Sequence, residues 1–207
     1  MSNPTLYIIG HSNVPVSALI NLLQRHRVTA IADVRSHPYS RYLPHFSQPA
    51  LKLALREAGI RYVFLGRELG ARPDDTACYV DGRAVYALIA SRPDFAQRIE
   101  RLHHGADTKR IALLCAEKDP VVCHRTILVC RHLRQTNLEI AHILADGSLE
   151  THAALERRLL QLHELNQLSF LDPKPLSAAI EEAYDRQGHM IAYVREENDD
   201  DRLTAGD

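Results

Sequence analysis

Apolar residues along the first two thirds of the chain follow two alternating patterns. In VSALINLLQRH (16–26) they recur three or four positions apart, as on one helix face, whereas TLYIIG (5–10) and RIALLCA (110–116) are short continuous runs, as in buried strands. The pattern predicts strands at residues 5–10, 28–34, 60–66, 110–116 and 139–144, and helices at 16–26, 47–59, 83–104 and 121–134, the third with a break or restart at Pro93.

Strands separated by helices of this length indicate parallel βαβ units, whose right-handed crossovers cover both faces of the sheet with helices. We therefore expect a three-layer α/β/α domain over residues 1–148, with a mostly parallel sheet of about five strands. Residues 149–195 contain two helical stretches and predict a helical C-terminal extension. Residues 196–207 are acidic and almost without large apolar side chains, which predicts a disordered tail.

Polar and ionisable residues gather directly after four of the expected strands. These segments are GHSN (10–13), DVRSHPYSRY (33–42), LGRELGARP (65–73) and CAEKDPVVCHR (115–125). Because the carboxyl ends of parallel strands share one edge of a sheet, the four loops are expected to surround a common crevice, where open α/β sheets bind ligands. The polar residues around the fifth strand have no such companions and are expected on the solvated surface; they are His142, Asp146 and His152.

The fourth segment combines a strand end with a helix start. Asp119 and Pro120 are typical of a cap and a first helical position, which places Cys123 in the first turn of the helix at 121–134. Free backbone N–H groups and the helix dipole favour an anion there, and Arg125 can add a bidentate fork for phosphate or carboxylate. The same field is expected to lower the pKa of Cys123 if its side chain faces the ligand.

We therefore predict one site with two kinds of residue. The candidate catalytic residues are His11, Glu117, Cys123 and His124, and the candidate substrate-binding residues are Ser12, Arg35, Ser36 and Arg125. Histidine moves protons near neutral pH, a carboxylate beside it tunes that exchange, and a thiolate is a nucleophile. The arginines and hydroxyl groups are suited to hold an anion.

Several of these residues have structural alternatives. Arg35 follows Asp33 closely enough to form a structural ion pair with it, and His11 and Ser12 can cap the helix that follows them. Cys115 ends a buried strand, where cysteine often serves as a small apolar residue.

A zinc site is a further alternative. Cys115, Cys123 and His124, with Glu117 or His11, supply donor types that zinc prefers. The spacing C-x7-C-H matches no standard zinc module, and adjacent residues on a helix point about 100° apart. The sequence therefore requires no cofactor, and zinc remains a minority alternative.

Composition narrows the class of protein. Of 207 residues, 45% are apolar and 25% charged, and the net charge is -1, which is ordinary for a soluble globular protein and shows no basic excess of the kind that binds nucleic acid. The N-terminus lacks a signal-peptide pattern, and no apolar run approaches the roughly 20 residues of a membrane helix. We expect a cytoplasmic protein with free thiols and no membrane partner.

Together, the polar segments resemble the family of domain of unknown function 488, found in bacteria and archaea. The resemblance rests on IIGHS (8–12), DVRSHPYS (33–40), GIRYVFLGRELG (59–70) and LLCAEKDPVVCHR (113–125), in that order, and spans about residues 5–135. It implies an α/β domain whose motif residues line one site, and it implies no reaction.

Three functions remain open at this point. The favoured one is an enzyme acting on a phosphorylated or otherwise anionic substrate, such as a nucleotide or a nucleic-acid end. The alternatives are a binding or sensing module for a small anion or nucleic acid, with RYLPHF (41–46) stacking on bases, and a redox-responsive protein that uses Cys115 and Cys123. The chain contains no P-loop, no GxGxxG fingerprint and no C-x5-R phosphate loop, and its oligomeric state is not encoded in any motif.

Overall fold

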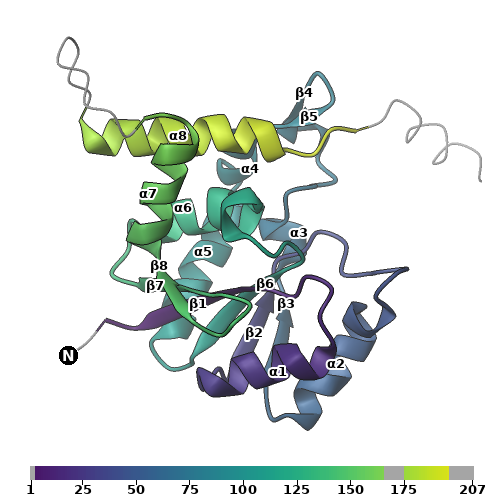
Figure 1. Ribbon diagram of the computed structural model, residues 1–207. Coiled ribbons are helices and arrows are strands. Elements are labelled where there is room, and N and C mark those ends of the chain that lie inside the picture. Colours follow the sequence, from purple (N-terminus) through teal and green to yellow (C-terminus); the bar gives the residue numbers. More distant parts are fainter. Residues whose placement is uncertain (1–2, 166–174, 196–207) are drawn as a thin grey trace, which may run out of the picture.

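A six-stranded sheet with helices on both faces organises the chain (Figure 1), for which the computed structural model describes residues 3–165 and 175–195. The strands of this sheet are β1 (Thr5–Gly10), β2 (Ala30–Asp33), β3 (Arg61–Phe64), β6 (Ile111–Cys115), β7 (Glu139–Ile143) and β8 (Leu149–Thr151). Their order is β3-β2-β6-β1-β7-β8. All neighbouring strands are parallel except β8, which runs antiparallel to β7.

The remaining elements connect and cover these strands. The helices are α1 (Val16–Arg25), α2 (Gln48–Glu57), α3 (Gly66–Leu69), α4 (Tyr86–Ala90), α5 (Pro93–Ala106), α6 (Arg131–Leu133), α7 (His152–Leu162) and α8 (Leu176–Ile191). Short turns are η1 (Pro44–Phe46), η2 (Thr76–Cys78) and η3 (Pro120–Val122), η4 (Arg125–Cys130) is a π-helix, and β4 (Tyr79–Val80) and β5 (Arg83–Ala84) form a separate hairpin.

Two apolar layers hold the helices against the sheet. Because successive strand residues point to opposite faces, Tyr7 and Ile9 of β1 pack in a layer with α1 and α2, whereas Leu6 and Ile8 pack in a larger layer with α4, α5, α7 and α8. Figure 1 shows the same division, with α1 and α2 lying together on one side of the sheet. The expected three-layer α/β architecture with a mostly parallel sheet is confirmed.

The C-terminal part of the chain packs on the sheet domain. Leu155 and Leu159 of α7 and Tyr184 of α8 belong to the same apolar layer as Leu6 and Ile8. After α8, the backbone pairs with β5, where Ala84 N–H donates to the Tyr193 carbonyl. The stretch 149–195 therefore shares its core with the domain, while the tail expected at 196–207 lies outside the described residues.

No helix within 3–165 and 175–195 combines the length and the apolar character needed to cross a membrane.

Two expected helices differ from the observed elements. The helix expected at 83–104 begins only at α4, because residues 83–84 form β5, and it restarts at Pro93 in α5 as expected. The helix expected at 121–134 is divided: Asp119 accepts a hydrogen bond from Val121 N–H and so caps only the short turn η3. Cys123 is then extended, with φ -131° and ψ 137°, and the helix continues after it as η4 and α6.

Candidate functional site

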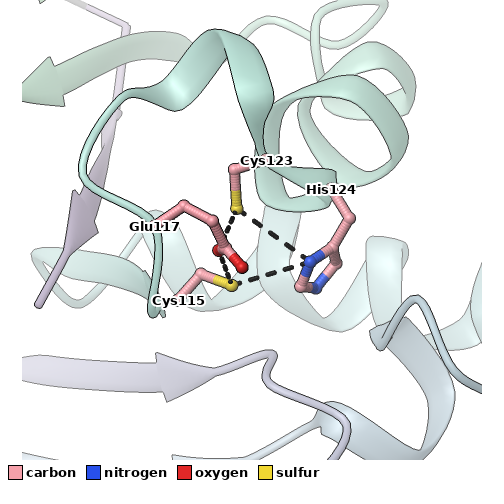
Figure 2. Close-up of side chains that lie close together, drawn as sticks. All are labelled: Cys115, Glu117, Cys123 and His124. Carbon is pink, nitrogen blue, oxygen red and sulfur yellow. Dashed lines mark hydrogen bonds between the residues drawn. The ribbon is translucent and has the colours of Figure 1, made fainter. Parts of the chain in front are cut away.

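Four side chains meet where β6 ends and η4 begins (Figure 2). Cys115 and Cys123 each donate an S–H hydrogen bond to the same carboxylate oxygen of Glu117, at 2.9 and 2.8 Å, and lie 3.6 and 4.0 Å from Nδ1 of His124. One ligand-type atom from each of the four residues lies within 4.8 Å of the others. We call Cys115, Glu117, Cys123 and His124 the thiol cluster.

The backbone that carries Glu117 is held against β1. Backbone N–H groups of His11 and Ser12 donate to the carbonyls of Cys115 and Ala116, at 2.9 and 2.8 Å. A Cβ atom at Gly10 would lie 1.8 Å from the Glu117 carbonyl oxygen, so only glycine permits this approach. The loop position that presents the carboxylate therefore depends on the end of β1.

The imidazole of His124 is oriented by its other nitrogen. Nε2 lies 3.0 Å from the carbonyl oxygen of Val34, and because a carbonyl only accepts, Nε2 carries the proton of that bond. Nδ1, which faces the two thiols, is then the atom with a free lone pair in the neutral ring. Backbone contact thus fixes both the direction and the tautomer of the ring.

The electrostatics of the thiol cluster differ from the sequence expectation. Cys123 has an extended backbone instead of lying in a helical turn, and its side chain is only 1% exposed. Burial strongly raises the pKa of its thiol, so the expected lowering of that pKa by a helix terminus is wrong. Burial opposes charge on Glu117 as well, but hydrogen bonds from the two thiols outweigh it and lower its pKa to about 2. His124 has a raised pKa because Cys123 and Glu117 outweigh its burial.

A pocket of about 220 Å³ opens beside the thiol cluster, and we call it the sheet-edge pocket. Residues from the loops after β2, α3 and β6 line it together with the end of the C-terminal part, among them Arg35, Ser36, Arg72, Glu117, His124 and Tyr193. Three of the four polar segments therefore meet at one pocket. The C-terminal contribution carries no sequence signal, because it depends on how α8 packs.

Arg72 is a charged pocket residue that the sequence analysis did not single out, although it lies in the polar segment LGRELGARP. Its guanidinium carbon lies 4.4 Å from the centre of the Tyr193 ring, and its backbone N–H donates to Ser36 Oγ at 2.9 Å. No carboxylate within residues 3–165 and 175–195 forms an ion pair with it. The side chain is exposed at the mouth of the pocket.

Arg35 also lines this pocket, but most of its N–H groups are used within the protein. It forms a buried ion pair with Asp33, with Nη2 2.6 Å from Oδ2, and Nη1 donates to the Phe46 carbonyl. Tyr62 donates its hydroxyl to the same Asp33 oxygen. The structural pairing considered for Arg35 is therefore present, and substrate binding by this residue stays a prediction.

His11 and Ser12 do not line the sheet-edge pocket. His11 is buried and stacked on Phe46, with ring centres 4.0 Å apart, and its Nε2 accepts from Arg35. Burial lowers the pKa of His11 to about 4, so the ring is neutral at pH 7. Ser12 lines a separate pocket with Lys118. Their proposed roles in catalysis and binding stay predictions.

Arg125 is enclosed by the protein. Its Nη1 donates to the Glu117 carbonyl at 2.7 Å and Nη2 to the Lys118 carbonyl at 3.4 Å, and the side chain is buried. It does not line the sheet-edge pocket. Arg125 therefore secures the loop that carries the thiol cluster, and its role with an anion stays a prediction.

A second polar group lies inside the molecule and corrects another expectation. His142 and His152, expected on the surface, are 1% and 8% exposed. Their ring nitrogens lie 3.0 Å apart, His152 bonds the Tyr184 hydroxyl at 2.9 Å, and that hydroxyl donates to Glu156. We call His142, His152, Glu156 and Tyr184 the histidine cluster. Asp146 is exposed, as expected.

Comparison with known proteins agrees with the resemblance of the polar segments. The model of the family described as Domain of unknown function DUF488 matches residues 15–131, more than half of the chain, so the chain belongs to this family. No curated protein and no solved structure matches the chain.

Proposed function

We propose that this member of the DUF488 family is an enzyme that acts on a small anionic substrate bound in the sheet-edge pocket. In this proposal, Arg72 holds the anionic group and the thiol cluster carries the chemistry on the facing wall. The observation that carries the proposal is that an arginine without an acidic partner in the described part of the chain lines the same pocket as Glu117 and His124.

The position of Arg72 supports anion binding. The Tyr193 ring contacts the guanidinium carbon, and a cation–π contact of this kind occupies no N–H donor, so the N–H groups can form a bidentate contact with an anion. Arg35 and Ser36 also line the pocket, and the second N–H of Arg35 Nη2 and the Ser36 hydroxyl can add donors. A carboxylate or a phosphoryl group is the natural partner of such a set.

The size of the pocket limits the substrate. Its volume of about 220 Å³ lies below the roughly 300–1,000 Å³ typical of sites for drug-sized ligands. The pocket therefore suits a small organic anion or the terminal group of a larger molecule, such as the phosphorylated end of a nucleotide.

Several ionisable types at one pocket support turnover as opposed to simple binding. Glu117 is ionised at neutral pH, His124 is held in one orientation, and Cys115 borders the same space. Groups with shifted pKa values that converge on a pocket are typical of active sites. A passive anion site needs Arg72 and Ser36 but has no use for the thiol cluster.

The test is a thermal-shift and calorimetric screen of small carboxylates, sugar phosphates and nucleotides, followed by turnover assays on every compound that binds. We expect Arg72→Ala to weaken the best ligand roughly 10- to 100-fold, the range for a lost hydrogen bond to a charged group. Arg101→Ala is the matched control, because Arg101 is exposed on α5 and does not line the pocket.

Two outcomes would overturn the proposal. If Arg72→Ala and Arg101→Ala bind every ligand as tightly as the wild type, the anion does not bind in this pocket. If a ligand depends on Arg72 but is recovered unchanged after long incubation with wild-type protein, the pocket belongs to a binding module and the enzymatic part of the proposal fails.

A further inference from the structure

We infer that the thiol cluster is a binding site for one thiophilic divalent metal ion, with zinc the expected ion. This inference goes beyond the proposed function, because it concerns an ion bound by the protein itself and can be tested without any substrate. The ligand atoms are the two cysteine sulfurs, Nδ1 of His124 and one carboxylate oxygen of Glu117.

The geometry of the thiol cluster is close to that of a tetrahedral site. Zn–S bonds of about 2.3 Å and Zn–N or Zn–O bonds of about 2.0 Å place neighbouring ligand atoms roughly 3.3–3.8 Å apart. Nδ1 of His124 lies 3.6 and 4.0 Å from the two sulfurs. The Glu117 oxygen is closer to them, at 2.9 and 2.8 Å, because it accepts their S–H hydrogen bonds.

The extended conformation of Cys123 makes this convergence possible. In a regular helix, Cys123 and His124 would point about 100° apart and could not face one point. Because Cys123 is extended before the helix begins, both side chains turn toward the end of β6 (Figure 2). The backbone irregularity thus removes the main objection that spacing raises against a metal.

The support around His124 is also that of a metal ligand. Metal-binding histidines usually donate their second ring N–H to a carbonyl or carboxylate, which fixes the lone pair of the first nitrogen on the ion. The Nε2–Val34 carbonyl bond of 3.0 Å does this for Nδ1 of His124. A histidine that only filled space would not need its lone pair aimed at two thiols and a carboxylate.

The charges balance when an ion is bound. A divalent ion replaces the two thiol protons, which pass to solvent, so two thiolates, one carboxylate and the ion carry a net charge of about -1. Arg125 Nη1 lies 3.9 Å from the Glu117 carboxylate and offsets that charge. Buried charges require such pairing.

The four ligands are not equivalent. The side chains of Cys115, Cys123 and His124 are buried, whereas that of Glu117 is 43% exposed and borders the sheet-edge pocket. Three buried ligands with a fourth position open to a pocket are the arrangement of catalytic zinc, in which water or substrate occupies the open position. Glu117 is therefore the ligand that a water molecule or substrate atom can replace.

The test is metal analysis of the purified full-length chain, after reconstitution with zinc and removal of loosely bound ions. We expect about one zinc ion per chain, and less than about a tenth of that in Cys123→Ser and in His124→Ala. Substitution with cobalt is expected to give thiolate-to-metal charge-transfer absorbance and the ligand-field bands of tetrahedral Co²⁺. Glu117→Gln is expected to retain the ion but to change the cobalt spectrum.

Cys130→Ser and Cys78→Ser are the matched controls, since both thiols are buried but lie outside the thiol cluster. Circular dichroism of each metal-free variant separates loss of a metal ligand from loss of the fold. If a variant at a buried ligand fails to fold, the cobalt spectrum of folded Glu117→Gln decides the test, because an unchanged spectrum would show that Glu117 does not bind the ion. The inference is overturned if reconstituted wild type binds no divalent metal, if the ion survives in folded Cys123→Ser, or if mild oxidation of the metal-free and the zinc-treated chain gives the same Cys115–Cys123 disulfide.

The two proposals fail separately. Metal content does not depend on Arg72, and ligand binding through Arg72 can be measured in the metal-free chain. If the chain binds zinc but no anion, the metal site stands and the proposed function fails. If the chain binds anions through Arg72 but no metal, the proposed function stands and the metal site fails.

Discussion

The thiol cluster and the histidine cluster are both buried groups of polar side chains, but they are connected differently. In the histidine cluster the hydrogen bonds run in a line. The Tyr184 hydroxyl gives its only proton to Glu156, so it must accept a hydrogen bond from Nε2–H of His152. Nδ1 of His152 is then unprotonated and accepts a hydrogen bond from Nε2–H of His142. In the thiol cluster, by contrast, four atoms converge on one point.

This difference indicates what each group is for. The line of donor–acceptor pairs joins α7 and α8 to the sheet and continues outward as the Arg134–Glu156 ion pair, although Nδ1 of His142 has no hydrogen-bond partner in the described part of the chain. A convergent set leaves the lone pair of His124 and two sulfurs aimed at one small space beside a pocket. Burial of polar groups alone does not identify a site; convergence of several donors on one point does.

The largest expected effect is the response to metal. A ligand present at a thousand times its dissociation constant stabilises the folded state by about 4 kcal/mol, so wild type should unfold at a markedly higher temperature in excess zinc than in chelator. Cys123→Ser should show no such difference, while His152→Gln should keep the full difference, because the histidine cluster takes no part. An equal zinc response in Cys123→Ser and wild type would erase the distinction between the two groups.

The next effect is on the pH dependence of stability, to which the histidine cluster contributes alongside the buried His11. Burial lowers the pKa of His152 to about 4 and that of His142 well below 6.5, so at pH 7 both rings are neutral in the folded and largely so in the unfolded chain. As pH falls below 6.5, the unfolded chain binds protons that the folded chain refuses. The free energy of unfolding should therefore fall, by about 3 kcal/mol for His152 alone, between pH 6.5 and 4.

Denaturant unfolding of the metal-free chain in steps of pH measures this dependence without interference from metal release. His152→Gln is expected to make the profile between pH 6.5 and 4 shallower, even if it lowers stability at pH 7, while His142 and His11 keep their contributions. A variant whose stability falls with acid as steeply as that of wild type would show that the titration lies elsewhere.

The local pattern of apolar residues was sufficient to predict the parallel sheet and most helices, because each of these elements is long enough to show its pattern. It did not predict β8 or the β4–β5 hairpin, since strands of two or three residues contain no period. The extended Cys123 was also missed. Asp119 is a good cap wherever it stands, and the sequence does not say whether the turn it caps stops after three residues.

The sequence indicated where in the fold the candidate site should lie, but it did not predict all the residues that line the pocket there. Strand ends directed attention to Arg35, Ser36, Glu117 and His124, which line the sheet-edge pocket, because parallel strands share an edge. Tyr193 could not be found in this way, since only the packing of α8 brings it to the pocket. The expected surface position of His142 and His152 was wrong, because the hydrogen bond between the two rings replaces the bonds that each would otherwise form with water.

The smallest of these effects comes from removing one hydroxyl oxygen. The same removal in each of the two regions allows a direct comparison between them. Tyr184→Phe removes the acceptor for His152 and a donor to Glu156, so it should lower the free energy of unfolding by about 1–3 kcal/mol. Tyr86→Phe makes the same chemical change beside the sheet-edge pocket, where the Tyr86 hydroxyl has no hydrogen-bond partner in the described part of the chain. Its cost should stay within about 0.5 kcal/mol. Chemical denaturation of both variants, at pH 7 without metal, compares them, and equal losses would mean that the line of hydrogen bonds through Tyr184 contributes nothing to stability.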